Sequence, residues 1–440
     1  MTTIEQHLPS AGTRGRWISD WRPEDRVFWE EGGARVARRN LVFSIFSEHV
    51  GFSVWSLWSV LVLFLGPAYH IDPAGKFVLT TVPTALGAVL RLPYTFAVAR
   101  FGGRNWTMIS AALLLVPAGL AAVVIRPGVS YGTLLAVAAV AGVGGGNFAS
   151  SMANINAFYP QRLKGWALGV NAGGGNLGVA VVQLAGLAVL ATAGNGHPRL
   201  VAGLYIPLIV LAALGAALWM DNLSGIGNDR RAMRDVARDA HTWVVSLLYI
   251  GTFGTFIGFG FAFGQVLQVQ FAGDFTSPIR AAYLTFLGPL LGSLARPVGG
   301  WAADRLGGAR VTFWNFVAMA LGATVVLAAS AQRSLALFIT GFVLLFVLSG
   351  IGNGSTYKMI PAIFRAKTSV EEARRLSGAL IGLAGAIGAF GGVLVNLAFR
   401  QSFLAYGSGN GAYVAFIAFY VLCSAVTWAV YLRSRNRLHV

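Results

Sequence analysis

Two arginines lie deep within apolar stretches of this 440-residue chain. Arg91 comes nine residues before Arg100, and Arg296 comes nine residues before Arg305, so the pattern repeats after 205 residues. Nine residues of helix rise about 13 Å, which places each buried arginine near the middle of a hydrocarbon layer about 30 Å thick. A guanidinium presents a rigid fork of N–H donors that can hold an oxyanion through two hydrogen bonds. The pair therefore predicts a site for a small planar anion.

A structural role for these arginines is the alternative, as partners of helix carbonyls or of a carboxylate. Glu48 is the only acidic residue inside an apolar stretch, and we place it nearer the cytoplasm than the arginines. Two carboxylate partners are therefore not available, which favours the anion site.

Three further ionisable residues, Glu48, His49 and Lys358, lie within apolar stretches or near their ends. Charged side chains at such depth are costly and usually functional. A carboxyl or an imidazole can take up and release a proton, and the charge of a nearby lysine would lower the pKa of a carboxyl. These three residues are therefore candidates for proton coupling. The alternative is a structural salt bridge of Glu48, for which Arg39 is the candidate partner.

Two glycine-rich segments contain intramembrane asparagines. The first covers residues 142–178, and the second begins at Gly350, 208 residues later. Glycine inside a membrane helix lets another helix or a small ligand approach the backbone, so the segments favour tight packing and ligand contact about equally. We expect the glycines to let the fourth, fifth, tenth and eleventh spans slide, and the asparagines to bond to exposed carbonyls. The residues concerned are Gly144, Gly145, Gly146, Asn147, Asn171, Gly173, Gly174, Gly175, Gly352, Asn353 and Gly354.

Composition indicates a polytopic membrane protein. Hydrophobic residues make up 56% of the chain and charged residues 11%, against about 25% charged in a soluble domain. The net charge of +17 is weak evidence for a nucleic-acid partner, because basic residues in short loops also set membrane topology. The single cysteine, Cys423, excludes an internal disulfide. We find no phosphate-binding loop, nucleophile elbow or His/Cys cluster, so we expect no enzyme, metal or cofactor.

Twelve apolar stretches are long enough to cross a bilayer as helices. Basic residues gather in the N-terminal tail and in the even-numbered connections, so both termini are predicted to be cytoplasmic. The predicted spans are 41–65, 77–99, 105–125, 133–158, 166–190, 200–220, 243–267, 281–302, 310–330, 334–358, 377–399 and 412–432.

The two halves of the chain resemble each other. Residues 91–103 and 296–308 repeat two arginines and two glycines at equal spacing, which together with the glycine repeat indicates internal duplication. Two parallel halves with a site between them at the membrane midplane are a known plan for transporters. We therefore expect an all-α membrane protein with two pseudo-symmetric six-helix halves. Its predicted parts are a tail at 1–40, a half at 41–220, a linker at 221–242, a half at 243–432 and a tail at 433–440.

Residues 299–310, GGWAADRLGGAR, resemble the loop motif of the major facilitator superfamily. The counterpart at 98–105 has Ala99 where this copy has Asp304. The motif leads us to expect a cytoplasmic gate or charge relay formed by Asp304, Arg305 and Arg310.

More specifically, residues 144–176 and 350–361 resemble the two signature segments of the nitrate/nitrite porter family, often called NarK-type. The resemblance covers essentially the whole chain and implies the major facilitator fold. It also implies that Arg91 and Arg296 clamp nitrate or nitrite.

The same resemblance implies aromatic walls and an asparagine contact at the anion site. It assigns Phe148 on the fourth span, Asn176 on the fifth, and Tyr249 and Phe253 on the seventh. Aromatic faces can sandwich a planar anion, and a tyrosine hydroxyl can donate to it. Each ring could instead face lipid or pack against other helices. On the first span the aromatic candidates stay open among Phe52, Trp55 and Trp58.

Residues 47–58, SEHVGFSVWSLW, resemble the porter subgroup held to import nitrate with protons. Importing a monovalent anion against an inside-negative potential costs about 2.3 kcal/mol per 100 mV, which one accompanying proton cancels. We therefore expect nitrate/H⁺ symport by alternating access, with electroneutral nitrate/nitrite antiport as the first alternative. A nitrate-binding sensor without net transport is the second. The expected partners are nitrate, nitrite, protons and lipid, and the expected state is a monomer in the bacterial inner membrane.

Overall fold

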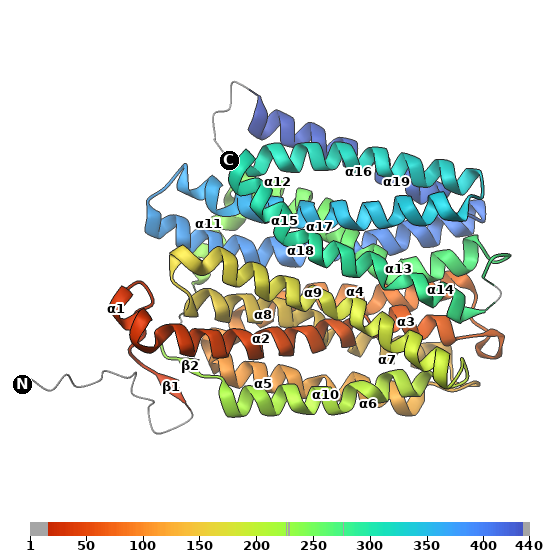
Figure 1. Ribbon diagram of the computed structural model, residues 1–440, viewed down its shortest axis with the longest axis horizontal. Coiled ribbons are helices and arrows are strands. Elements are labelled where there is room, and N and C mark those ends of the chain that lie inside the picture. Colours follow the sequence, from red (N-terminus) through yellow and green to blue (C-terminus); the bar gives the residue numbers. More distant parts are fainter. Residues whose placement is uncertain (1–15, 226, 228, 276, 434–440) are drawn as a thin grey trace, which may run out of the picture.

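The computed structural model describes residues 16–225, 227, 229–275 and 277–433. The ends of the two predicted tails, 1–15 and 434–440, lie outside the described residues. Helices form nearly all of the described structure (Figure 1). Within those residues the only strands are β1 (Trp17–Ile18) and β2 (Asn222–Leu223), which pair in parallel.

The first part of the chain folds into helices that occupy the lower half of Figure 1. They are α1 (Arg26–Phe28), η1 (Trp29–Gly33), α2 (Ala34–Trp55), α3 (Leu57–Phe64), η2 (Pro67–Tyr69), α4 (Pro73–Phe101), α5 (Gly103–Leu113), α6 (Leu115–Val124), α7 (Tyr131–Val140), α8 (Val143–Phe158), α9 (Gln161–Thr192) and α10 (Pro198–Trp219).

The rest of the chain folds into helices that occupy the upper half of Figure 1. They are α11 (Arg230–Arg238), α12 (Ala240–Tyr249), η3 (Ile250–Gly254), α13 (Thr255–Gln270), α14 (Pro278–Thr285), α15 (Leu287–Leu306), α16 (Gly308–Ala331), α17 (Leu335–Arg365), α18 (Val370–Tyr406), α19 (Asn410–Thr427) and η4 (Trp428–Leu432).

Eleven helices of the described residues are long and apolar enough to cross a membrane. The predicted span at 281–302 is not among them. Its residues form two helices, α14 and α15, that are interrupted at Phe286, and α15 carries the buried charge of Arg296. The first span also differs from the prediction, since helical structure begins at Arg26 instead of residue 41. Asp25 starts this helix by accepting hydrogen bonds from the backbone N–H groups of Val27 and Phe28.

The repeated Gly-Gly pairs end two helices in the same way. Gly102 follows α4 with φ of +86°, and Gly307 follows α15 with φ of +90°. These backbone angles favour glycine, because a Cβ atom would be strained there. The repeat noticed in the sequence therefore marks equivalent turns in the two halves.

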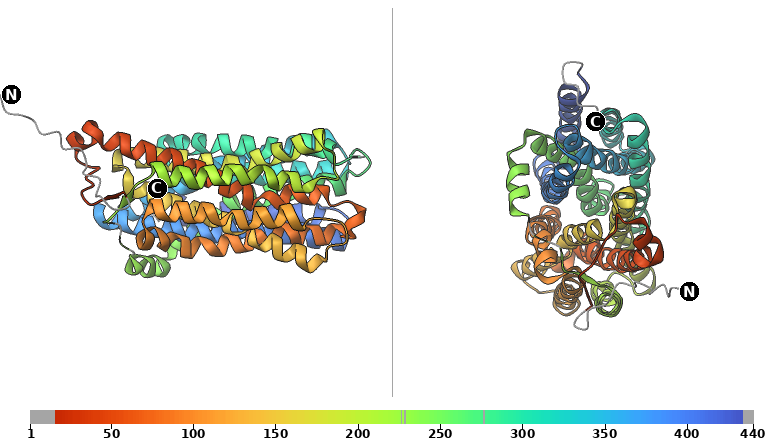
Figure 2. Two further views of the ribbon diagram at one scale, coloured as in Figure 1. Left: turned by 90° about the horizontal axis from the view of Figure 1, so that it is seen from below. Right: turned by 90° about the vertical axis from the view of Figure 1, so that its left-hand side faces the viewer.

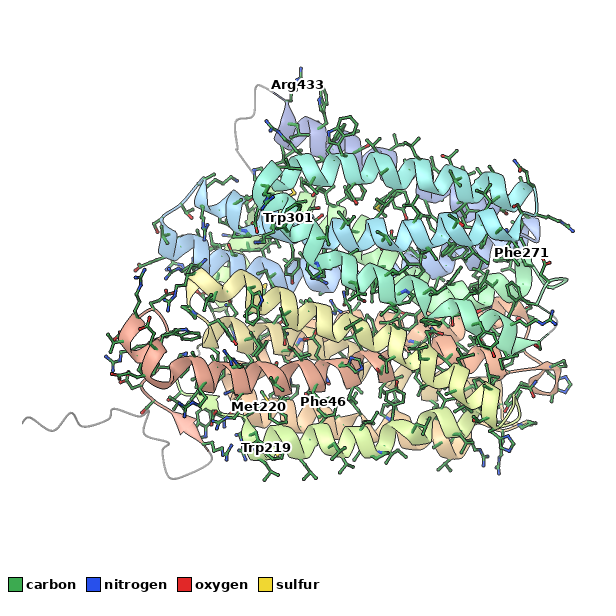
Figure 3. All side chains as sticks on the ribbon, in the orientation of Figure 1. Phe46, Trp219, Met220, Phe271, Trp301 and Arg433 are labelled. Atoms are coloured by element: carbon green, nitrogen blue, oxygen red, sulfur yellow. The ribbon has the colours of Figure 1, made fainter. Side chains whose placement is uncertain are left out.

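The outer surface is apolar, as a lipid-facing surface requires. Trp219 and Trp301 project from it with exposed fractions of 47% and 55% (Figure 3). The helices run roughly parallel to one another along the long axis of the molecule (Figure 2). The all-α character and the bundle of apolar helices expected from the sequence are confirmed.

The two halves are closed against each other at the end away from the chain termini. Gln265 Nε2 donates to the Pro73 carbonyl at 2.6 Å, and Thr80 Oγ1 donates to Asn396 Oδ1 at 3.0 Å. Phe77 stacks on Phe399 with ring centroids 6.1 Å apart. Each of these contacts joins the first half to the second.

At the end where the termini lie, a wide cavity opens between the halves. It has a volume of about 560 Å³ and is lined by the first turns of α9 and by residues of α15, α17 and α18. Basic side chains outnumber acidic ones around it: Arg162, Lys164, Lys358, Arg365 and Arg374 against Asp304.

Candidate functional site

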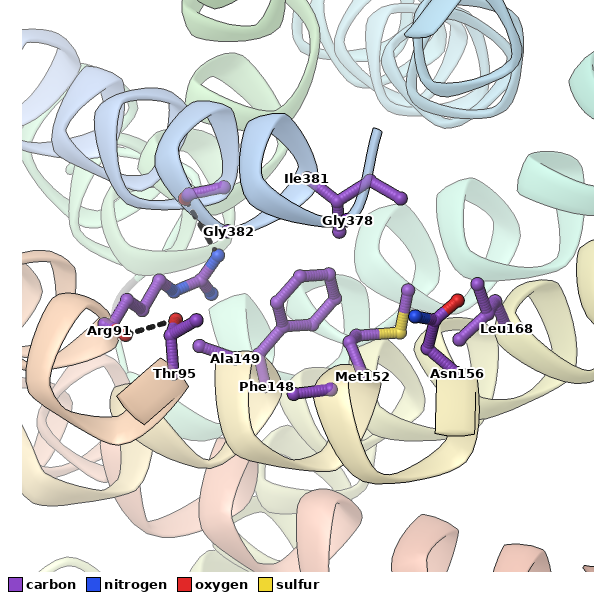
Figure 4. A pocket seen from close by; sticks show the side chains of 12 residues that line it. Arg91, Thr95, Phe148, Ala149, Met152, Asn156, Leu168, Gly378, Ile381 and Gly382 are labelled. Atoms are coloured by element: carbon purple, nitrogen blue, oxygen red, sulfur yellow. Dashed lines mark hydrogen bonds between the residues drawn. The ribbon is translucent and has the colours of Figure 1, made fainter. Parts of the chain in front are cut away.

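Arg91 is completely buried on α4 and joins the two halves. Its Nε donates to the carbonyl of Gly145 on α8 at 3.1 Å, and its Nη1 donates to the carbonyl of Gly385 on α18 at 2.9 Å (Figure 4). Its Nη2 has no hydrogen-bond partner. One end of the guanidinium is thus fixed while a donor stays available.

Arg296 occupies the corresponding position on α15, with 5% of its surface exposed. Its Nη2 donates to the hydroxyl of Tyr249 at 3.3 Å, and its Nη1 has no hydrogen-bond partner. Across the described residues, neither Arg91 nor Arg296 has a carboxylate within salt-bridge distance. Two buried cations, each with an unused donor, are what an anion site needs.

Aromatic rings connect the two arginines. The Phe148 centroid lies 4.5 Å from the guanidinium carbon of Arg91 and 5.9 Å from that of Arg296. Phe253 lies 4.8 Å from Arg91 and stacks on Tyr249 at 5.2 Å with an interplanar angle of 10°. All three rings are buried, so the site has apolar walls of low dielectric that strengthen hydrogen bonds to an anion. The structure brings together five of the six residues predicted for the anion site.

Asn176, the sixth, lies on α9 and is fully buried, with both amide atoms unpartnered. No described contact joins it to either arginine. Asn147 and Asn353 are likewise buried with both amide atoms unpartnered, so the expected bonds to helix carbonyls are absent in the described structure.

The structure narrows the choice among the three aromatic candidates on the first span. Phe52 and Trp55 lie 5.8 Å and 5.4 Å from the Arg91 guanidinium, whereas Trp58 makes no such contact with it among the described rings. Trp55 already donates its Nε1 hydrogen to the Pro83 carbonyl at 2.8 Å. Phe52 and Trp55 therefore supply ring surface to the site.

Tyr357 on α17 belongs to the site and was not predicted. Its ring lies 5.3 Å from the guanidinium carbon of Arg296 and 5.2 Å from the ring of Tyr249, and its buried hydroxyl has no partner. The available signal was its position inside the second glycine-rich segment, next to Lys358. The carbonyls of Gly145 and Gly385 were also missed, because backbone acceptors have no sequence signature.

A π-helical turn, η3, begins directly after Tyr249 and contains Phe253. Gly254 within it packs so closely on α18 that an added Cβ would come 2.7 Å from the Cα of Gly391. The wider turn changes the rotation of the helix at the point where these two rings face the site. Such single π turns are frequent at functional sites.

The signature glycines pack helices within each half instead of between halves. A Cβ on Gly144 would come 2.2 Å from the Gly51 carbonyl on α2, and one on Gly354 would come 2.2 Å from the Arg296 carbonyl on α15. Gly173 has nothing within 4 Å of such a Cβ, so it makes no tight helix contact here, and the sliding expected of these spans stays a prediction. The other close contacts are Gly145 to α4, Gly146 to Tyr94, Gly174 to Ile45, Gly175 to Glu48 and Gly352 to Thr252.

Glu48 is fully buried on α2, and Asn171 Nδ2 donates to its Oε2 at 2.7 Å. Its Oε1 has no hydrogen-bond partner. The alternative salt bridge to Arg39 is not formed, because Arg39 pairs with Asp221 at 2.6 Å. His49 faces the Gly174 carbonyl at 3.1 Å. Glu48 thus keeps a carboxyl oxygen free in an enclosed environment.

Lys358 does not lie with Glu48. Its Nζ bonds both carboxylate oxygens of Asp304 at 2.8 Å, on the wall of the wide cavity. Arg305 lies over the Trp301 ring at 4.2 Å, and Arg310 is exposed at the start of α16. The three residues expected to form a gate therefore lie at the end of the molecule that carries the termini.

A narrower cavity leads from Arg91 toward this end (Figure 4). It passes Thr95, Phe148 and Met152, and it shares the lining residues Asn156 and Leu168 with the wide cavity. The narrow cavity beside Arg91 therefore adjoins the wide basic cavity.

Comparisons with known proteins agree with this architecture. A model described as Major Facilitator Superfamily matches residues 43–395. The chain also resembles the xylose transporter XylE from E. coli in a partially occluded inward open conformation, with a TM-score of 0.67. That match has 11% sequence identity and covers 92% of this chain and 99% of the other.

Sequence relatives extend over nearly the whole chain. The protein named "Nitrate/nitrite transporter NarU" from Salmonella typhimurium is 38% identical, covering 96% of this chain and 97% of the relative. A protein from Thermus thermophilus named "Probable nitrate/nitrite antiporter NarK2" is 33% identical, covering 96% of this chain and 97% of the relative.

Proposed function

The chain belongs to the nitrate/nitrite porter family of the major facilitator superfamily, and we propose that it imports nitrate together with protons. Members of this superfamily are transporters, not enzymes. The observation that carries the proposal is the pair of buried arginines, each with an unused N–H donor and no carboxylate partner among the described residues. A monovalent oxyanion supplies the missing acceptors.

The site favours a small planar anion over a larger or more highly charged one. Phe148 and Phe253 lie within 5 Å of the Arg91 guanidinium and limit the space beside it. A flat anion can lie against these rings while its oxygens accept from both guanidiniums. The substrates printed in the names of the relatives, nitrate and nitrite, have this shape and charge.

Alternating access is the transport mechanism that this arrangement supports. Contacts such as Thr80 to Asn396 close one end, while the wide basic cavity opens at the other. We propose that the open end faces the cytoplasm of a bacterial inner membrane, with both termini on that side. Rocking of the two halves would break the closed contacts and expose Arg91 and Arg296 to the opposite face.

Glu48 is the proposed proton carrier. It is the one carboxyl enclosed within the described spans, and its free oxygen has room for a proton without losing the bond from Asn171. The guanidiniums of Arg91 and Arg296 are close enough to interact electrostatically with it. Protonation of Glu48 would remove a negative charge near the site and so favour entry of the anion.

Electroneutral exchange of nitrate for nitrite is the second candidate, because the Thermus thermophilus relative is named an antiporter. Exchange would use the same arginine clamp and would leave Glu48 in a structural role. It needs no titrating group, since the charge that enters equals the charge that leaves.

Proteoliposomes containing the purified protein distinguish the two modes. Nitrate uptake is measured with an acidic exterior and empty lumen, and separately with internal nitrite at equal pH. Uptake driven by the pH gradient alone supports symport. Uptake that requires internal nitrite would replace symport by exchange, and no uptake in either condition would overturn nitrate transport itself.

A further inference from the structure

A second, smaller cavity lies inside the first half, away from the aromatic rings of the anion site. It lies between α2, α5 and α8, and its free volume of about 10 Å³ is about that of one water molecule. Its walls carry Glu48, Asn147 and six hydroxyl side chains, all of them buried. The hydroxyls belong to Ser44, Ser47, Thr107, Ser110, Ser150 and Ser151.

Several polar atoms on this cavity have no partner in the protein. They are Glu48 Oε1 and both amide atoms of Asn147, which is only 3% exposed. Buried polar groups of this kind are normally satisfied by ordered water. The lining of the cavity is mostly polar, so the cavity is suited to hold a single water against the carboxyl of Glu48.

Hydrogen bonds link the cavity walls to one another. Ser44 Oγ and Ser151 Oγ are 3.0 Å apart, and Asn171 Nδ2 lies 2.5 Å from Ser151 Oγ and 2.7 Å from Glu48 Oε2. A serine hydroxyl can donate and accept at the same time, so the Ser44–Ser151 pair can pass a proton along. Asn171 only donates here, and it holds Glu48 and Ser151 in place.

The polar groups continue from the cavity toward the end that carries the termini. Thr107 Oγ1 donates to the carbonyl of Gly103, the first residue of α5. Asn40 lies four residues before Ser44 on α2. Its side-chain amide donates to Asp221 Oδ2 at 2.9 Å and accepts from the backbone N–H of Asp221 at 2.9 Å. Asp221 also accepts from Arg39, whose side chain is 41% exposed. Asp221 thus lies close to the surface, held by an asparagine one helical turn before Ser44 on α2.

We infer that these groups form a proton path from Glu48 to Asp221 that runs inside the first half, separate from the cavity leading out of the anion site. The inference rests on the proposed proton coupling and names the route by which the proton leaves. The species that moves along this path is a proton carried by water.

The transfer is balanced in protons and charge. The O–H bond of the Glu48 carboxylic acid breaks, its proton passes to water in the cavity, and Glu48 becomes a carboxylate. Water and the hydroxyls of Ser110 and Thr107 each accept one proton and release another. Asp221 takes up the last proton and loses it to bulk solvent, while Asn40 holds its carboxylate in position.

The charged and titratable groups facing Glu48 are few. Arg91 on α4 and Arg296 on α15 are the cations that act on it electrostatically, and His49 is its neighbour on α2. The titratable hydroxyls of the anion site are those of Tyr249 and Tyr357. The described lining of the small cavity contains no titratable side chain other than Glu48. A proton that enters this cavity therefore has the hydroxyls and water as its carriers.

The test removes hydroxyls on α5, outside the anion site, in the double variant Thr107→Val with Ser110→Ala. The matched control is Thr312→Val in the other half, 205 residues later, where the Thr312 hydroxyl lies 2.9 Å from Ser355. Vesicles with a trapped pH-sensitive dye report proton entry driven by external nitrate. Nitrate/nitrite counterflow at equal pH reports the anion site. We expect the double variant to keep counterflow and lose most nitrate-driven proton entry, and the control to keep both.

Each outcome decides something. Proton entry in the double variant equal to that of the unaltered protein overturns the path and leaves coupling intact. Absence of nitrate-driven proton entry in the unaltered protein overturns both. If the double variant loses counterflow as well, Asp221→Asn decides: loss of proton entry with counterflow kept supports the path, and unchanged proton entry overturns it.

Discussion

The guanidiniums of Arg91 and Arg296 lie over the same aromatic ring, with their carbons 4.5 Å and 5.9 Å from the centroid of Phe148. Two positive charges this close repel each other, and an anion that lies close to both offsets the repulsion. The described structure offers them no carboxylate at salt-bridge distance, and each retains an unpartnered N–H donor. The predictions below follow from this relationship and from the surroundings of Glu48.

Arg91→Lys should reduce nitrate uptake to background although the positive charge is kept. Lysine cannot bond to both Gly145 and Gly385 and still offer a donor to the anion, because it is a compact point charge. Losing a charge-assisted hydrogen bond costs about 1.5–3 kcal/mol, or about tenfold to a hundredfold in affinity. Uptake into proteoliposomes measures this, with Arg433→Lys, directly after the last helix, as the control. Normal transport by the Arg91→Lys protein would contradict the clamp.

Tyr249→Phe should weaken nitrate binding several-fold without unfolding the protein. The hydroxyl of Tyr249 accepts from Arg296 Nη2, and removing it frees that guanidinium to move. A neutral hydrogen bond contributes about 0.5–1.5 kcal/mol. Competition between labelled and unlabelled nitrate measures the change. Tyr420→Phe, which loses a buried hydroxyl contact with Thr255 far from the arginines, should leave the affinity unchanged.

Glu48→Gln should keep nitrate/nitrite counterflow and abolish uptake driven by an acidic exterior. Glutamine can still accept from Asn171 but cannot gain or lose a proton. In the unaltered protein, uptake should rise as the external pH falls, because external protons supply the driving force. The rate of nitrate uptake by the variant should not change with external pH between pH 5 and pH 8. An unchanged pH dependence would remove Glu48 from coupling.

Gly144→Ala should lower the melting temperature of the purified protein, whereas Gly173→Ala should not. A Cβ at Gly144 would come 2.2 Å from the Gly51 carbonyl, a backbone atom that cannot turn aside, while a Cβ at Gly173 meets nothing within 4 Å. Overpacking of this kind costs about 1–3 kcal/mol. Thermal unfolding in detergent compares the two, and equal melting temperatures would show that the α2–α8 contact has room to relax.

The family, the helical class and the fold could be predicted from the sequence and are confirmed. Hydropathy locates most spans because each must cover the same hydrocarbon thickness. The interruption of the helix at Phe286 was not predicted, because apolar residues continue on both sides of it. The exact residue boundaries of the two halves, the linker and the tails stay a prediction.

The candidate site was predictable where charge and spacing single out a residue. Arg91 and Arg296 stand out because buried charges are rare and theirs repeat after 205 residues. Tyr357 and the carbonyl of Gly385 could not be found in this way, since an aromatic in an aromatic-rich chain and a backbone oxygen look ordinary in a sequence. The hydroxyl-lined cavity was missed because its walls come from three helices distant in the chain.

Calorimetric titration of nitrate into the purified protein tests the anion site most directly, because it needs no assumption about coupling. The unaltered protein should bind one nitrate, and Arg91→Lys and Arg296→Lys should each weaken that binding about tenfold or more while melting at the same temperature as the unaltered protein. Binding of the same strength in both variants would contradict the assignment of these two guanidiniums as the nitrate site.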